Sequence, residues 1–226
     1  MIGVFDSGDG GLCTVEKIRE LSPLADICFL ADRDNAPYGT KTRGEIVSLT
    51  KKNIKVLKDM GAERVLIACC TASSVFPLLS ESEKKIAVPI IDATARAAAE
   101  KTRLKKIGVI ATKATVMSGA FEKSIKQTLP SAEVYTEETQ ELVSLIEGGA
   151  RDGNLRARTR EAVEKALLNI KRRQFDVLIL GCTHFSRLEK TISEILGCET
   201  VSSALIGALE ILSIADTRGS GRNVFL

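Results

Sequence analysis

Two cysteines stand just after apolar segments that are typical of buried strands. Cys69 follows residues 64–68, and Cys182 follows residues 176–180 with one glycine between them. A thiol has a reference pKa of about 8.5, so modest changes in its surroundings make it an acid or a base near neutral pH. A buried cysteine is usually an inert part of a core, but open α/β sheets place ligands at the carboxyl ends of their strands. The pair is therefore a candidate for proton transfer.

Polar residues follow both thiols. Hydroxyl groups come within two residues, at Thr71 and Thr183, and the single histidine of the chain, His184, comes two residues after Cys182. If a turn brings Cys182 and His184 together, the two would also suit a thiol hydrolase. In the structural alternative, the histidine and the thiols are only parts of a core.

A third polar segment, residues 6–11, comes after the first apolar run. Its glycines allow tight turning and close approach of the backbone to a ligand. The segment nearly matches the dinucleotide motif G-x-G-x-x-G, with Gly8 and Gly10 in place, Cys13 at the third position and Asp32 as a ribose partner. A nucleotide site is a further candidate, and simple capping of the next helix is its structural alternative.

Short apolar runs alternate with longer amphipathic stretches along the chain, which is typical of an α/β fold with parallel sheets. A helix is expected over residues 45–60, because apolar side chains recur there at helical spacing and Gly61 is a natural end. The predicted strands span residues 2–5, 27–31, 64–68, 88–91, 106–110, 134–135, 176–180 and 199–201.

The chain contains a faint internal duplication. Residues 2–7 resemble residues 107–112, and residues 65–71 resemble residues 177–183, in the same order. If the halves are related, each brings a small polar residue and a cysteine to the carboxyl ends of its strands. We therefore predict two similar α/β domains with mainly parallel sheets, and an active site in the cleft between them.

Composition excludes several classes of protein. The net charge of +3 comes from 32 basic and 29 acidic residues spread along the chain, and aromatic residues make up only 4%, which disfavours nucleic-acid binding. No apolar run approaches the ~18–20 residues of a membrane span, and the first residues lack a signal-peptide pattern, so a cytoplasmic protein is expected. The six cysteines show no C-x-x-C spacing and are expected to be reduced, without a metal.

Racemisation gives these features one explanation. Inverting a stereocentre without a cofactor requires a base on one face of the α-carbon and an acid on the other, and two cysteines supply both. Asp6 and His184 would be the matching orienting or proton-relay groups, one for each thiol. Hydroxyl and backbone N–H groups would hold the carboxylates of an amino acid.

The chain resembles the glutamate racemase family, within the wider aspartate/glutamate racemase group, over nearly its whole length. The blocks that carry the resemblance are Gly3-Val4-Phe5-Asp6-Ser7-Gly8 with Gly10-Gly11, Pro37-Tyr38-Gly39, Cys69 with Thr71, Gly108-Val109-Ile110 with Thr112 and Thr115, Leu145-Ile146-Glu147, and Leu180-Gly181-Cys182-Thr183-His184-Phe185.

The resemblance implies roles for individual residues. Cys69 and Cys182 become the two proton donors and acceptors, with Asp6 assisting the first, His184 assisting the second and Glu147 supporting His184. The substrate-binding set that it implies is Asp6, Ser7, Tyr38, Gly39, Cys70, Thr71, Thr112, Thr115, Thr183 and His184.

The resemblance also implies an organisation and a setting. The domains are expected to be residues 1–92 plus 205–226 and residues 93–204. No metal or pyridoxal phosphate is used. The partner is a small amino acid, with no nucleic acid and no membrane, and a homodimer is left open. The usual role in the family is the supply of D-glutamate for bacterial peptidoglycan.

The chain departs from the family pattern at several positions. Cys70 stands where an asparagine is usual, and an ungapped comparison of the two halves sets Cys70, not Cys69, opposite Cys182. Because successive strand residues point to opposite faces, only one of the adjacent thiols can face the α-carbon, and the family pattern favours Cys69. Further departures are Thr139-Gln140 for Cys-Pro, Ser186 for proline and Ser202 for aspartate. A racemase of aspartate or another amino acid, and a catalytically weak or binding-only homologue, remain alternatives.

Overall fold

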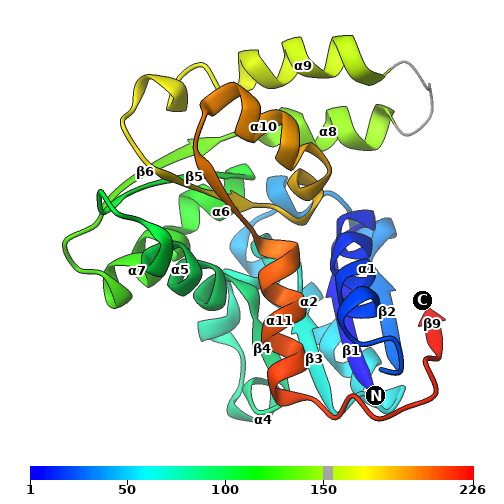
Figure 1. Cartoon of the computed structure of the whole chain (residues 1–226). Helices are drawn as coiled ribbons and strands as arrows, with labels where there is room; N and C mark the ends of the chain where they lie inside the picture. Colours follow the sequence, from blue (N-terminus) through cyan, green and yellow to red (C-terminus); the bar gives the residue numbers. More distant parts are fainter. Residues whose placement is uncertain (150–154) are drawn as a thin grey trace.

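The computed structural model describes residues 1–149 and 155–226, and the strands in these residues form two sheets with only parallel pairings (Figure 1). The predicted α/β class is therefore confirmed. The first sheet has the order β4-β3-β1-β2-β9, with strands Ala87–Pro89, Arg64–Ile67, Ile2–Asp6, Ile27–Ala31 and Asn223–Phe225. The second sheet has the order β6-β5-β7-β8, with strands Glu133–Glu138, Lys106–Ala111, Val177–Gly181 and Glu199–Ser202.

The two sheets repeat one topology. If β5 to β8 are matched in order with β1 to β4, the second sheet has the same strand order as the first four strands of the first sheet. The cross-strand register differs by one residue from the ungapped duplication, because Val4 pairs with Leu66 in the first sheet and Val109 pairs with Ile179, not Leu178, in the second. The pattern of the faint sequence duplication thus recurs in three dimensions.

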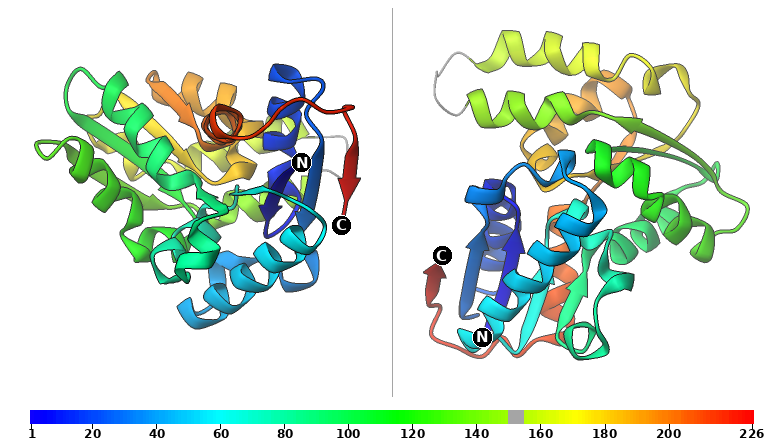
Figure 2. Two further views of the ribbon diagram at one scale, coloured as in Figure 1. Left: turned by 90° about the horizontal axis from the view of Figure 1, so that it is seen from below. Right: turned by 180° about the vertical axis from the view of Figure 1, so that it is seen from behind.

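Three hydrophobic cores hold the helices against the sheets. Helix α2 (Arg43–Asp59) covers one face of the first sheet. Helices α1 (Leu12–Leu21), α5 (Ile90–Lys101), α7 (Ala120–Thr128) and α11 (Ser203–Ile214) share a central core with the inner faces of both sheets. Helices α8 (Gln140–Gly149), α9 (Leu155–Ala166) and α10 (Glu189–Leu196) lie over the outer face of the second sheet (Figure 2). The remaining short helices are α3 (Cys70–Ser73), α4 (Glu81–Lys84) and α6 (Lys113–Ser118).

Local sequence explains where several elements differ from the predicted bounds. The strand predicted over residues 88–91 ends at Pro89, and α5 begins at Ile90, because proline has no N–H for a ladder and suits a helix start. Helix α2 begins at Arg43 rather than at residue 45, because Thr42 and Glu45 form a reciprocal capping box. Strand β6 is longer than predicted, and β9 was not predicted.

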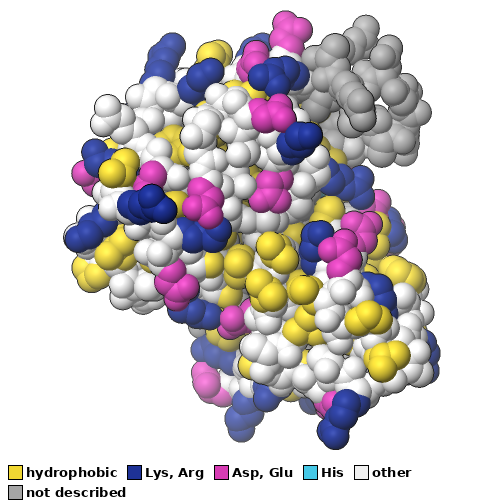
Figure 3. Space-filling model, in the orientation of Figure 1, with side chains coloured by type: hydrophobic (Ala, Val, Ile, Leu, Met, Phe, Trp, Pro, Cys, Tyr) yellow, Lys and Arg dark blue, Asp and Glu magenta, His cyan; other side chains and the backbone are white. Residues whose placement is uncertain are grey.

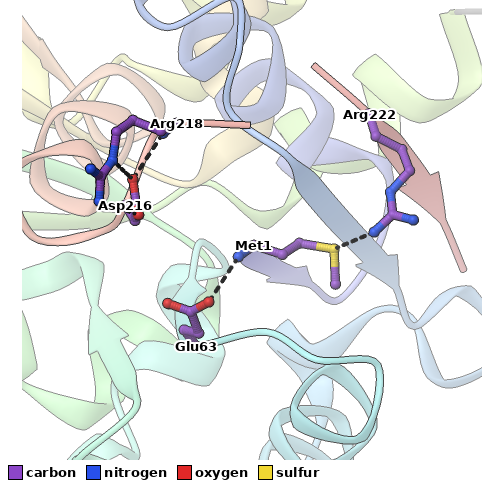
Figure 4. A network of polar contacts seen from close by, with 5 residues as sticks. All are labelled: Met1, Glu63, Asp216, Arg218 and Arg222. Carbon is purple, nitrogen blue, oxygen red and sulfur yellow. Dashed lines mark hydrogen bonds and ion pairs between the residues drawn. The ribbon is translucent and has the colours of Figure 1, made fainter. Parts of the chain in front are cut away.

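The C-terminal segment returns to the first sheet. Strand β9 pairs with β2, and Asp26 Oδ1 accepts hydrogen bonds from the backbone N–H groups of Ser220 and Arg222 at 3.0 and 2.9 Å. Figure 4 shows Arg222 beside Met1, with 3.8 Å between Arg222 Nη2 and Met1 Sδ. The two ends of the chain therefore lie in the same part of the molecule.

The surface over α11 carries exposed hydrophobic side chains, among them Leu205, Leu209 and Ile214 (Figure 3). Within residues 1–149 and 155–226, no helix combines the length and the apolar character that a membrane crossing requires.

Candidate active site

The first thiol of the site belongs to Cys69, which follows β3 and precedes α3. Its side chain is 6% exposed, and its Sγ lies 3.2 Å from the Oγ of Ser7, which follows the neighbouring strand β1. Burial and the nearby carboxyl group of Asp6 raise the pKa of the Cys69 thiol to about 11. The thiol is therefore protonated at neutral pH and needs a partner to take its proton.

The second thiol belongs to Cys182, which follows β7. A 3₁₀ helix, η6 (Thr183–Leu188), begins at the next residue and brings His184 Nδ1 to 3.6 Å from Cys182 Sγ. Burial raises the pKa of the Cys182 thiol well above its ordinary value. Burial and the Arg187 guanidinium lower the pKa of His184 to about 4, so its imidazole is neutral and can exchange a proton with the thiol.

The strand register identifies which adjacent cysteine is equivalent to Cys182. Leu66 and Ile179 hold matching places in the two sheets, and Cys69 and Cys182 each come three residues later. Both thiols continue the row of side chains that faces the outer cores, whereas Cys70 turns into the central core. The ungapped alignment that set Cys70 opposite Cys182 is therefore wrong by one residue, although Cys70 also lines the pocket.

Asp6 connects the two halves of the site. Its carboxylate is fully buried and accepts hydrogen bonds from the Gly8 N–H at 3.0 Å and from the Thr183 hydroxyl, of the second half, at 2.9 Å. Burial raises the pKa of Asp6 to about 7, against the lowering effect of these two donors. Asp6 is therefore a group that changes charge near neutral pH.

Glu147 lies near the far nitrogen of His184. Its Oε1 is 3.2 Å from His184 Nε2, but the two atoms do not form a hydrogen bond, and Nε2 has no hydrogen-bond partner among the described residues. The carboxylate side chain is 46% exposed. Burial and the charge of Asp9 raise the pKa of Glu147. The arrangement brings the carboxylate close without fixing the ring.

Three buried threonines form a cluster of hydroxyl groups that spans both halves. Thr71 Oγ1 lies 2.8 Å from Thr112 Oγ1 and 3.1 Å from Thr115 Oγ1, and the last two are 2.8 Å apart. Thr71 comes from the helix after β3, and Thr112 follows β5. A hydroxyl both donates and accepts, so the cluster can reorient toward a carboxylate.

The hydroxyl of Tyr38 is hydrogen-bonded to two other side chains. It donates to Asp32 Oδ2 at 2.5 Å, and Asn53 donates to both residues. Burial and Asp32 raise the pKa of Tyr38. Asp32 also accepts from Asn35, so the carboxylate that a ribose would need in the dinucleotide interpretation is already bound by three donors.

The glycines after β1 serve the contact between the two halves. A Cβ at Gly10 would lie 2.5 Å from both Thr183 Oγ1 and His184 Nδ1. Glycine is therefore required there for close approach to the second half of the site, which accounts for the motif without a nucleotide.

These residues surround a pocket with about 20 Å³ of free space, which is enough for about one water. All predicted site residues line the pocket except Asp6 and Thr115. Asp6 lies directly behind Thr183, and Thr115 lies directly behind Thr71 and Thr112. Gln140 and Val143 also line the pocket and were not predicted as site residues, although helical spacing back from Glu147 indicates both. The other lining residues that were not predicted are Gly8, Ala36, Pro37 and Gly181.

Known proteins are similar to this chain over most of its length. The family model described as Asp/Glu/Hydantoin racemase matches residues 15–211. A glutamate racemase of Aquifex aeolicus (strain VF5) is 35% identical over 224 residues, which cover 97% of this chain and 85% of the relative.

Solved structures agree. Glutamate racemase isoform RacE1 from Bacillus anthracis has a TM-score of 0.91 at 31% identity, and the match covers 100% of this chain and 86% of the RacE1 chain. The glutamate racemase from Francisella tularensis subsp. tularensis SCHU S4, in complex with D-glutamate, has a TM-score of 0.88 at 31% identity, with coverages of 99% and 86%. The chain therefore belongs to the Asp/Glu/Hydantoin racemase family and, within it, to the glutamate racemases.

Proposed function

We propose that this chain interconverts L- and D-glutamate without a cofactor, by proton transfer between Cys69 and Cys182. The observation that carries the proposal is the pair of buried thiols at equivalent strand ends of two sheets, both lining one pocket. Opposed acid and base groups are what inversion at a carbon centre requires, because one face loses a proton while the other gains one.

The chemical step conserves protons. A thiolate on one side removes the Cα proton, and the thiol on the other side gives its own proton to the opposite face, so the two sulfurs exchange protonation states. Because burial raises both thiol pKa values, each thiol needs a neighbour that accepts its proton. Asp6, with a pKa of about 7, can serve Cys69, and neutral His184 can serve Cys182 at 3.6 Å.

The substrate is proposed to be held by hydroxyl and backbone groups rather than by a cation. The hydroxyl of Ser7 lies beside the Cys69 thiol, and the hydroxyl of Thr183 lies beside Asp6. The threonine cluster lies at the wall formed by Thr71 and Thr112. The relative from Francisella was solved with D-glutamate, which supports glutamate as the ligand here. The pocket leaves room for about one water, so we expect the side chains of the two halves to move apart when glutamate enters.

The same proposal includes a setting. We expect residues 1–92 plus 205–226 and residues 93–204 to act as two domains, and the pairing of β9 with β2 supports the first grouping. We expect the enzyme to supply D-glutamate for peptidoglycan in the cytoplasm, as the family implies. A homodimer is left open, and sedimentation velocity at micromolar concentration would distinguish the mass of two chains from that of one.

Deuterium exchange tests the activity directly. In D₂O, purified protein without added cofactor should incorporate deuterium at Cα of both L- and D-glutamate and invert them. Absence of exchange with every acidic amino acid at high enzyme concentration would contradict the catalytic claim. Exchange with aspartate or another amino acid, but not glutamate, would favour the altered-substrate alternative, and binding without exchange would favour a binding-only homologue.

A further inference from the structure

The first residue of α8 lies in the pocket wall with an unused polar atom. Gln140 lines the pocket, and its Oε1 is buried without a hydrogen-bond partner among the described residues. The side chain reaches across to the other half of the site, since a Cβ at Gly39 would overlap Gln140 Oε1 and lie 2.9 Å from Thr112 Cβ. A buried acceptor without a partner destabilises the fold, so its position calls for a ligand.

Helix geometry separates Gln140 from the second thiol. Gln140, Val143 and Glu147 all line the pocket, and their spacing places them on one face of α8. Glu147 marks the end of this face beside His184. Seven residues of helix separate it from Gln140, about 10 Å along the axis. Gln140 therefore lies toward the end of the pocket that Gly39 and Thr112 form, away from Cys182 and His184.

We propose that Gln140 is a specificity-determining residue, whose amide binds the distal carboxyl group of the substrate together with the hydroxyls of the threonine cluster. The inference rests on the proposed function, because that function places the α-carbon between the thiols and directs the side chain of glutamate elsewhere. A half-turn about the last side-chain bond exchanges the oxygen and nitrogen of the amide. The same position can then donate two N–H groups to a carboxylate.

Two variants test the amide, and both require kinetics with glutamate and with glutamine. Gln140→Leu keeps the volume but removes the donors, so KM for glutamate should rise about ten- to a hundredfold while kcat changes little. Gln140→Glu places a like charge at the distal carboxylate. It should therefore lower kcat/KM for glutamate relative to glutamine at least about tenfold, because an amide can still donate to the new carboxylate.

A matched control is available in the loop before β7. Gln174 is exposed and lies outside the pocket, so Gln174→Leu and Gln174→Glu should leave the ratio of glutamate to glutamine turnover unchanged. If Gln140→Leu does not fold, Gln140→Asn keeps the amide on a shorter stem and should give an intermediate KM. Thermal unfolding of every variant separates a loss of folding from a loss of recognition.

The outcomes distinguish this inference from the proposed function. If the parent racemises glutamate but the ratio of the two substrates is the same in Gln140→Glu and in the parent, the role of Gln140 is wrong and the function stands. If the parent racemises nothing, the function fails, and calorimetric binding of glutamate and glutamine to the same variants still tests recognition. Binding of neither amino acid to the parent would overturn both.

Discussion

The two thiols occupy equivalent places, but their neighbours differ. By the strand register, Asp6 of the first sheet corresponds to Ala111 of the second, and His184 of the second half corresponds to Thr71 of the first. One thiol thus has a carboxyl group with a pKa of about 7 nearby, and the other has an imidazole with a pKa of about 4. Repeated topology supplies two sulfurs at equivalent strand ends, whereas the groups beside them come from unrelated positions. The proposed inversion therefore does not require symmetric side chains around the two thiols.

Removing either sulfur should have the largest effect on activity. Cys69→Ala and Cys182→Ala should each lower racemisation in both directions by about 10³–10⁴-fold, because each direction needs one thiol as base and the other as acid. Polarimetry or a coupled D-glutamate assay would measure the loss. Cys198→Ala is a suitable control, since that partly exposed thiol lies outside the pocket. Full activity in Cys69→Ala together with loss in Cys70→Ala would contradict the register assignment.

Deuterium exchange tests whether the two thiols face opposite sides of the α-carbon. Each alanine variant keeps one thiol, which can remove and return a proton on one face only. In D₂O, Cys69→Ala should therefore label one enantiomer of glutamate and Cys182→Ala the other, without inversion, as measured by mass spectrometry. Labelling of the same enantiomer by both variants would show that the thiols do not face opposite sides of the α-carbon.

Asp6 should control the pH dependence. As the pH rises through about 7, its carboxyl group ionises and becomes a base, so kcat/KM should rise between pH 6 and 8. Asp6→Asn should lower kcat/KM about a hundredfold at pH 8 and remove this inflection. An unchanged inflection in the variant would assign it to another group.

The same substitution has an opposite effect on stability. Burial raises the pKa of Asp6 from 3.8 to about 7, so stability is lost as the pH rises between these values, by about 4 kcal/mol at most. Asp6→Asn carries no charge and should be more stable than the parent above pH 7, but not below pH 4. Denaturant unfolding at both pH values measures the difference. Equal stability of the two proteins at pH 8 would mean that burial of the ionised Asp6 does not destabilise the fold.

His184 should have a smaller and different effect. His184→Asn should lower kcat/KM about ten- to a hundredfold, by the same factor in both directions, because the two enantiomers have equal free energies. With a pKa of about 4, the imidazole is neutral between pH 6 and 8, so the shape of the pH profile should not change there. A new slope in the profile of the variant would contradict a neutral imidazole.

Cys70 should have the smallest effect on activity. Its side chain is 2% exposed and packs into the central core, so Cys70→Asn should destabilise the fold by about 1–3 kcal/mol through overpacking. Activity on glutamate should stay within about threefold of the parent. A large gain in kcat/KM in a stable variant would mean that the Asn amide does reach the substrate, as the family pattern implies.

Much of the fold could be predicted from periodicity. The strand over residues 27–31 was predicted with its observed bounds, because a fully buried parallel strand has an uninterrupted apolar run. The predicted strand covers only residues 134–135 of β6, because its last two residues are charged. The edge position of β6 in the second sheet makes those charged residues acceptable. β9 has only three residues, which are too few for a periodic pattern, and its pairing with β2 depends on contacts nearly two hundred positions away along the chain.

The site was predicted from the family pattern and from the ends of strands. These identify which residues belong to the site, but not which side chains they contact. Ser7 was expected to bind substrate, but its contact with Cys69 follows from the adjacency of β1 and β3. The binding of the Tyr38 hydroxyl by Asp32 depends on side-chain orientation, which no spacing rule gives. Gln140 was seen only as a departure from a pattern, because its reach toward Gly39 requires both halves of the molecule.

The contacts that join the two halves across the pocket are made by hydroxyl groups, from Thr183 to Asp6 and from Thr71 to Thr112 and Thr115. Each such hydrogen bond contributes about 0.5–1.5 kcal/mol, so the three together form a latch of only a few kcal/mol. The two sheets also share the central hydrophobic core, so these hydrogen bonds are only the polar part of the contact between the halves. Because these hydrogen bonds are weak and the free space is small, an inhibitor larger than the substrate would bind only by keeping the two halves apart. Its binding would therefore compete with closure of the pocket.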